Sequence, residues 1–329
     1  MKNVAVSILF FLLLVVSPLR AAIPTQYEGD SWTNTQYNTT EGTEFWVTFM
    51  RSSGSSGQDN KDMSLYLYAT SRENAIVTIS NPNQYGSNIT FNVRAGKQDS
   101  CLIPNSWAYI EEDKRVSNFG VKVTSTKPIA LYATNQHSSG KYDATNVLPT
   151  TALMGEYVVQ TYRIDQYSTE FAVVATQYQT ITIHLKKTTI DIQEYETNGK
   201  VVVKSKDEET ITLTMRPGQT YLYRSASDDG GASANRATSL SGTTICSNAP
   251  IALFMGGQSA KVPSDPENHI FSQAYPTDKW GKTFYVTPTY GMVYDYVQFT
   301  ACKNNTQIRR NGNVIATINA RESYIDTIK

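Results

Sequence analysis

Short runs in which apolar and polar residues alternate follow one another along most of the chain. Val, Ile, Thr, Tyr and Phe dominate these runs and Gly, Asn, Ser and Pro bound them, as in antiparallel strands. Helical periodicity is almost absent. The pattern predicts strands at residues 45–49, 64–69, 76–79, 89–93, 120–124 and 129–133, and again at 157–159, 171–175, 181–185, 211–215, 221–223 and 251–254.

An internal repeat underlies this pattern. Residues 94–136 recur without a gap as residues 216–258, so that the Pro-Ile-Ala-Leu run beginning at Pro128 returns at Pro250. Each copy opens on a glycine followed by an aromatic strand, at Gly42, Gly155 and Gly281. The chain is therefore built from copies of one unit.

The repeat predicts the fold class and the division of the chain. Six or seven short strands in a unit of about 110 to 125 residues fit tandem β-sandwich-like repeats, whereas propeller blades are usually shorter, at about 40 to 50 residues. We expect a signal peptide (1–22), an amino-terminal lead (23–41), a first β repeat (42–154), a second (155–280) and a partial third (281–329).

The third copy is expected to be incomplete. It continues through strands near residues 296–301, 314–318 and 324–325, and no counterpart of the Pro-Ile-Ala-Leu strand follows. A repeat without its last strands leaves an open edge. This predicts either a shortened gene product or a fragment of a longer protein.

The amino end has the three parts of a secretory signal peptide. A positive charge at Lys2 precedes a run from Val4 to Val16 that is apolar except for Ser7, and small residues follow, with cleavage expected after Ala21 or Ala22. A retained anchor is the alternative, but the run is too short to span a membrane easily. We expect a secreted or cell-surface protein with no transmembrane segment in the mature chain.

The amino-acid composition limits the classes of partner that the chain is expected to bind. The formal net charge is zero and 18% of residues are charged, with no basic block, which argues against nucleic acid and anionic membranes as partners. The cysteines, Cys101, Cys246 and Cys302, stand where other copies have Tyr or Thr. Packing roles are therefore expected, more firmly for Cys101, while a bridge between Cys246 and Cys302 stays open.

Two connectors, 135–154 and 256–280, show no strand pattern and are long for a compact domain. Such a connector is either functional or a packed junction between units. If a ligand binds, these stretches are where we expect it first, and Tyr142 is the exposed aromatic residue to test.

The sequence offers little catalytic or metal-binding chemistry. His137 and His269 lie in the connectors and His184 in a strand, but none has partners at ligand spacing. The acidic loops 59–62 and 228–231 lack the spacing of an EF-hand and favour turns. No nucleophile elbow or phosphate-binding loop occurs. We therefore assign no catalytic, metal or cofactor residue, and the ligand-binding residues and oligomeric state are undetermined.

A combination of motifs resembles the IgG Fc-binding protein N-terminal domain family. The motifs are Gly-Thr-Glu-Phe-Trp-Val at 42–47, Lys-Pro-Ile-Ala-Leu-Tyr at 127–132, Asp-Ala-Thr-Asn-Val-Leu-Pro-Thr at 143–150 and Trp-Gly-Lys-Thr-Phe-Tyr-Val at 280–286. The third motif resembles the bacterial, Bacteroidota-like branch. Animal members carry a cysteine and paired prolines ahead of the Trp-Gly, where this chain has residues 267–270 and only Pro276, so the family's disulfide does not carry over.

The resemblance implies an exported binding protein. The leading hypothesis is a non-enzymatic secreted or cell-surface adhesion module that recognises a host glycoprotein such as mucin or immunoglobulin Fc. The alternatives are structural spacer repeats of a longer surface protein and, more remotely, a glycan-active enzyme.

Overall fold

The computed structural model describes residues 40–52, 63–84, 86–164, 167–191, 203–205, 209–225, 236–262 and 266–328. The predicted signal peptide, most of the amino-terminal lead and both acidic loops lie outside the described residues. Within them the fold is all-β and sandwich-like, as predicted, with antiparallel sheets and a single short α-helix, α1 (Asn105–Ala108). No helix in the described ranges is both long and apolar enough to cross a membrane.

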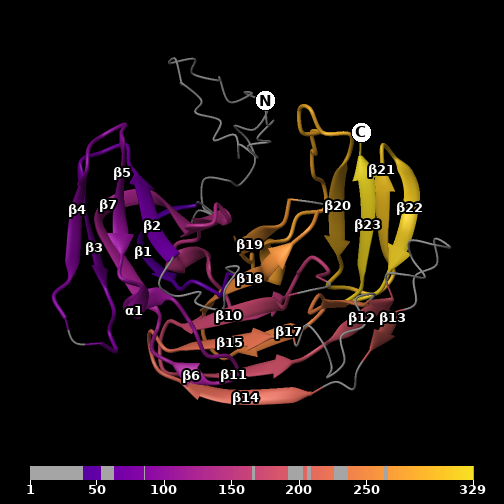
Figure 1. Cartoon of the computed structure of the whole chain (residues 1–329), viewed down its shortest axis with the longest axis horizontal. Coiled ribbons are helices and arrows are strands. Elements are labelled where there is room, and N and C mark those ends of the chain that lie inside the picture. Colours follow the sequence, from indigo (N-terminus) through magenta and orange to yellow (C-terminus); the bar gives the residue numbers. More distant parts are fainter. Residues whose placement is uncertain are drawn as a thin grey trace, which may run out of the picture. The chain divides into compact units, whose positions relative to one another are not determined.

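The first copy forms a seven-stranded antiparallel sheet (Figure 1). Its order is β4-β3-β7-β2-β5, and β1 and β8 also pair with β7. The long central strand β7 replaces the two strands predicted at 120–124 and 129–133, because Pro128 does not interrupt it. The strands are β1 (Glu41–Val47), β2 (Met63–Thr70), β3 (Ala75–Ser80), β4 (Ile89–Val93), β5 (Gln98–Ile103), β7 (Val121–His137) and β8 (Tyr142–Val147).

The second copy divides the same pattern between two sheets. One has the order β19-β18-β10-β15-β6 and the other β14-β11-β17-β9, while β13-β12-β16 forms a small third sheet. The strands of the second copy are β9 (Glu156–Val158), β10 (Thr169–Ala175), β11 (Gln179–His184), β12 (Thr188–Asp191), β13 (Val203–Ser205), β14 (Thr210–Met215), β15 (Thr220–Arg224), β16 (Arg236–Ser239), β17 (Thr244–Ser247), β18 (Ile251–Ala260) and β19 (Asn268–Gln273). The short strand β6 (Val116–Ser117) comes from the first copy and pairs with β15.

The third copy contains two separate strand pairs. In Figure 1, β20 (Asp295–Thr300) lies beside β23 (Ser323–Ile328), and β21 (Thr306–Arg310) beside β22 (Asn313–Ile318). The aromatic strand predicted after Gly281 is absent, and the side chains of Phe284, Tyr285 and Val286 are exposed. Apolar alternation alone does not hold a strand, because its main-chain groups also need a neighbour to pair with.

Pairing recurs from copy to copy. The pair β2–β5 corresponds to β10–β15 and to β20–β23, and the pair β3–β4 corresponds to β11–β14 and to β21–β22. These are the pairings expected of one repeated unit, because the same strand sequence pattern selects the same register.

The first two copies share a hydrophobic core. One buried cluster contains Phe49 from the first copy together with Phe254 and Phe271 from β18 and β19. The Phe271 ring stacks on Phe254 at 5.4 Å and on Phe49 at 5.5 Å between centroids. Stacked aromatic rings add to the burial of apolar area, so they tie the copies together.

A glycine of each copy also receives a turn of the next. Gly120 donates its N–H to the Gly218 carbonyl oxygen at 3.0 Å, and a Cβ on Gly242 would fall against the Arg321 carbonyl oxygen. Gly218 and Arg321 occupy the same turn position, and both have a left-handed backbone, with φ of 75° and 69°. Corresponding glycines of the first and second copies therefore lie against the corresponding turn of the next copy, although the hydrogen bonds differ, since the Gly242 carbonyl oxygen accepts from the Arg321 Nε at 2.7 Å.

All three cysteines are free. The bridge left open between Cys246 and Cys302 does not form, and both side chains are exposed. Only Cys101 packs partly against the core, which fits the packing role expected of it. Cohesion within the described ranges therefore comes from burial and hydrogen bonds.

Candidate functional site

The two connectors are not irregular, contrary to the sequence-based expectation. Residues 135–154 include the end of β7 and all of β8, and residues 256–280 include the end of β18 and all of β19. Each connector thus forms a hairpin. The pattern was missed because Tyr142–Val147 is mostly polar and small, and its strand is held by pairing to β7.

The two hairpins pack on one another. Gln273 accepts a hydrogen bond from the Leu148 N–H at 2.6 Å and donates its own N–H to the Thr145 hydroxyl at 2.8 Å. The Phe271 N–H donates to the Asp143 carboxylate at 2.8 Å. Of the two roles that the sequence left open for the connectors, the structure shows a packed junction between copies.

Both connector histidines are buried. His269 is buried, its Nε2 lies 3.1 Å from the Asn135 amide nitrogen, and burial lowers its pKa to about 4. The Nδ1 of His137 lies 2.7 Å from the Ser139 hydroxyl and accepts the Ser139 N–H. No group of three metal-ligating side chains occurs among the described residues.

Two carboxyl groups have raised pKa values, Asp143 in β8 and Glu170 in β10. Burial raises the pKa of Asp143 to about 6 despite hydrogen bonds from the Phe271 and Ala144 N–H groups. Glu170 in β10 is wholly buried, and burial raises its pKa well above the usual value, opposed by the nearby Arg224 and Arg51. Because Glu170 is closed off from solvent, it can govern stability but cannot receive a large ligand, whereas Asp143 is half-buried and its carboxylate is occupied by two main-chain N–H groups.

Tyr142, proposed from sequence as the residue to test, is exposed at the start of β8. Its N–H donates to the Asn268 side chain at 2.8 Å, so the main chain at this point is tied to β19. The structure therefore places Tyr142 at the rim of the junction, away from the groove described next.

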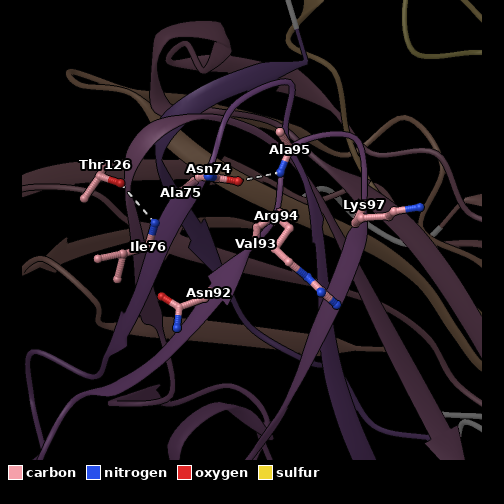
Figure 2. Close-up of a pocket in the computed structure, with 9 residues that line it drawn as sticks. All are labelled: Asn74, Ala75, Ile76, Asn92, Val93, Arg94, Ala95, Lys97 and Thr126. Atoms are coloured by element: carbon pink, nitrogen blue, oxygen red, sulfur yellow. Dashed lines mark hydrogen bonds between the residues drawn. The ribbon is translucent and has the colours of Figure 1, made fainter.

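A shallow groove of about 610 Å³ lies on the first copy (Figure 2). It runs over β3, β4 and the turn after β4. Its lining residues are Asn74, Ala75, Ile76, Asn92, Val93, Arg94, Ala95, Lys97 and Thr126. The exposed Ile76 side chain, at 49% of its full area, supplies an apolar patch among polar groups.

Local hydrogen bonds shape this groove. The Asn74 side chain accepts the Ala95 N–H at 2.9 Å, and the Thr126 hydroxyl accepts the Ile76 N–H at 3.0 Å, as Figure 2 shows. Gly96 then takes a left-handed backbone, with φ of 69°, which lets the chain turn back into β5. The turn thus holds Arg94 and Lys97 at the groove rim.

Two positively charged side chains at the groove have no negatively charged partner among the described residues. The side chains of Arg94 and Lys97 are exposed, and neither forms a salt bridge or hydrogen bond with a described residue. With the Asn92 amide nearby, they could bind carboxylate or sulfate groups and donate to hydroxyls, while Ile76 contacts an apolar face. This chemistry suits an acidic, hydroxyl-rich ligand.

The second copy has the same turn but not the same groove. The Thr180 N–H donates to the Asn248 side chain at 3.0 Å, as Ile76 does to Thr126. Gln219 replaces Lys97, however, and the turn carrying Gly218 is covered by the first copy, where Asn83 donates to the Pro217 carbonyl oxygen at 2.8 Å. The groove is thus specific to the first copy.

The groove residues were not identified from sequence. They come from three separate segments, and only pairing of β3 with β4 and β7 brings them together. The sequence feature that could have identified the groove is a difference between the copies, because the first has Lys97 where the second has Gln219. A strictly repeated unit that gains a charge at one exposed turn is a candidate for function.

A family model described as IgGFc binding protein matches residues 143–328, which is more than half of the chain and runs from β8 to β23. No curated protein matches the chain.

Proposed function

We propose that this chain, which belongs to the IgGFc binding protein family, is an exported, non-enzymatic adhesion module that uses the groove of its first copy to hold an acidic host glycoprotein. The family is one of binding domains. The observation that carries the proposal is the pair of exposed cations Arg94 and Lys97 around the apolar Ile76, neither of which has a charged partner among the described residues.

Mucin fits this chemistry better than immunoglobulin Fc. Mucin glycans present many acidic sugars and sulfate groups, and a shallow groove with two cations gains from repeated weak contacts with such a ligand. A protein surface such as Fc would need a larger apolar contact area than Ile76 alone supplies. Immunoglobulin Fc is therefore the second ligand to compare.

The test is binding of the purified full chain to immobilised intestinal mucin and to IgG Fc by surface plasmon resonance. The variant Arg94→Glu/Lys97→Glu should lose mucin binding by at least about tenfold, because each contact of a charged group contributes about 1 kcal/mol or more. Arg216→Glu is the matched control, since Arg216 holds the same turn position as Arg94 in the second copy.

Retained binding in the double variant, with the chain still folded, would overturn the groove as the contact site. Absence of binding to either ligand would overturn the adhesion proposal. It would favour the second candidate, a structural spacer, for which the repeated contact of Gly120 with Gly218 and of Gly242 with Arg321 is the supporting observation.

A further inference from the structure

One buried carboxyl group lies where the second copy packs on the first. Glu170 is fully buried in β10, whose neighbours in the sheet are β15 and β18. Ala172, two residues further along β10, belongs to the hydrophobic cluster that contains the core of the first copy. Because side chains two residues apart in a strand lie on one face, Glu170 faces the first copy. It is not among the residues that line the groove.

This carboxyl group lacks the donors that a buried carboxylate needs. Neither of its oxygens accepts a hydrogen bond from a described residue. The Arg51 main-chain N–H and the guanidinium groups of Arg51 and Arg224 lie near enough to oppose the rise in the pKa of Glu170, but burial outweighs them. A buried carboxylate without hydrogen bonds is strongly disfavoured, so the packed chain favours the neutral acid.

The direct neighbour of Glu170 across the strands is Arg224 in β15. Leu222, two residues earlier, belongs to the same cluster as Ala172, so Arg224 also faces the first copy. The Nε of Arg224 is buried and donates to no described residue, while its Nη2 lies 3.0 Å from the Asp113 carboxylate of the first copy. Arg224 thus ties the second copy to the first and keeps one donor unused.

This ion pair holds a segment of the first copy, residues 111–117, against β15. The Lys114 N–H donates to the Leu222 carbonyl oxygen at 2.7 Å, and β6, at the end of the segment, pairs with β15. The Lys114 Nζ also lies over the Tyr223 ring, 5.2 Å from its centroid. Loss of the ion pair at Asp113 would therefore weaken the attachment of this segment to the second copy.

The charged groups that face Glu170 come from both copies. They are Arg224 from β15, Asp113 from the segment 111–117 and Arg51 after β1. The neighbour of Glu170 in β18 is Gly256, which has no side chain. On β19, His269 lies two residues from Phe271, the partner of Gly256. Arg224 therefore has a carboxyl group of each copy beside it.

We propose that Glu170, Arg224 and Asp113 form a proton-operated latch between the first and second copies. While Glu170 is neutral, Arg224 pairs with Asp113 and holds the copies together. When Glu170 loses its proton, two carboxylates compete for one guanidinium group. Water can stabilise the Asp113 carboxylate, which is 26% exposed, but not that of Glu170, so Arg224 turns to Glu170 and releases Asp113.

The direction of the pH effect follows from the burial of Glu170. Because the pKa of Glu170 is raised in the packed chain, its contribution to the junction is present at low pH and is lost as the pH rises through that pKa. The latch is therefore closed in acid and opens as the solution becomes more alkaline.

The test follows the junction of the full chain by hydrogen–deuterium exchange from about pH 5 to about pH 9, a range in which buried glutamates titrate. The rates are corrected for the intrinsic effect of pH on exchange. Protection of the segment 111–117, which includes the Lys114 N–H, should fall at least about tenfold, the change that one pKa unit represents. In Glu170→Gln, whose side chain stays neutral, protection should remain at its low-pH level.

Two further variants separate the latch from simple packing. Asp113→Asn removes the partner of Arg224 in the first copy, so protection of the segment 111–117 should be low already at the acid end of the range and change little with pH. The matched control is Glu112→Gln. Glu112 is the adjacent, exposed residue and pairs with Arg115, so this variant should follow the curve of the unmodified chain.

Three outcomes would overturn the proposal. They are protection of the segment 111–117 that does not change with pH in the unmodified chain, a pH-dependent loss that persists in Glu170→Gln, and high protection of Asp113→Asn in acid. The first would mean that Arg224 bridges both carboxylates, and the second that another group titrates. Mucin binding enters none of these measurements, so this proposal and the adhesion proposal can fail separately.

Discussion

The substitution Gly120→Ala tests the contact through which the first and second copies join. A Cβ at this position would lie 2.6 Å from the Gly218 carbonyl oxygen and 2.8 Å from the Val174 Cγ1 atom. The first neighbour is main chain and cannot rotate away. The backbone of Gly120 is not left-handed, so alanine is otherwise compatible with its conformation, and the effect is steric.

The expected loss of stability follows from three contributions. Overpacking costs about 1 to 3 kcal/mol, and weakening the 3.0 Å hydrogen bond from Gly120 to Gly218 costs about 1 kcal/mol. Alanine restricts the unfolded chain, which offsets about 0.4 to 1 kcal/mol. The net destabilisation is about 2 kcal/mol, or roughly 3 °C in melting temperature for the compact unit of residues 39–329.

The assay is urea unfolding followed by circular dichroism, with the midpoint and slope compared between variants. Gly281→Ala is the matched control. Its Cβ would make ordinary contacts with the Phe284 ring at 3.4 Å and the Thr283 carbonyl oxygen at 3.8 Å, and its backbone is not left-handed, so it should be neutral or slightly stabilising. A Gly120→Ala chain as stable as the Gly281→Ala chain would refute the packing of Gly120 against the Gly218 turn.

Three more predictions concern stability. Arg321 has a left-handed backbone and donates hydrogen bonds to the Gly242 and His184 carbonyl oxygens, so Arg321→Gly should destabilise and Arg321→Ala should destabilise by about 1 kcal/mol more, an order that thermal melts would check. Between about pH 4 and 6.5 the folded chain holds an extra proton at Asp143, whose pKa is raised to about 6, and one fewer at His269, whose pKa is lowered to about 4. The His269 contribution, which Asp143→Asn keeps, should therefore raise the stability by about 3 kcal/mol as pH rises through this range, and the Asp143 contribution, which His269→Gln keeps, should lower it by a similar amount. Buried Glu170, whose pKa is also raised, contributes equally to both variants, so equal slopes in urea titrations of the two would contradict this. Finally, a reducing agent should leave the melting temperature unchanged because the cysteines are free, and a drop would reveal a disulfide.

Much of the strand pattern could be predicted from the sequence because a strand that buries one face alternates apolar and polar residues. The alternation in Met63–Thr70 and Ala75–Ser80 appears as alternating burial in the structure. Because the second copy repeats this sequence pattern, the same strands could be predicted there, and they correspond to β10 and β11. Such local signals suffice where burial and pairing agree.

Sequence reasoning failed where pairing decided the outcome. The polar segment Tyr142–Val147 became a strand because β7 pairs with it, whereas the apolar segment around Phe284 did not, because no described strand pairs with it. The groove could not be predicted from the sequence either, because Ile76, Arg94 and Thr126 come together only when β3 pairs with β4 and β7. These outcomes depend on contacts between segments distant in the chain.

The central claim is that the groove of the first copy holds an acidic glycan ligand. Hydrogen–deuterium exchange of the full chain with and without soluble mucin glycopeptides tests it most directly. The account predicts slower exchange in the segments that line the groove, around Ile76 and from Asn92 to Lys97, with the corresponding turn at Arg216 unchanged. Protection confined to the hairpin around Tyr142, or none in either segment of the groove, would contradict the claim.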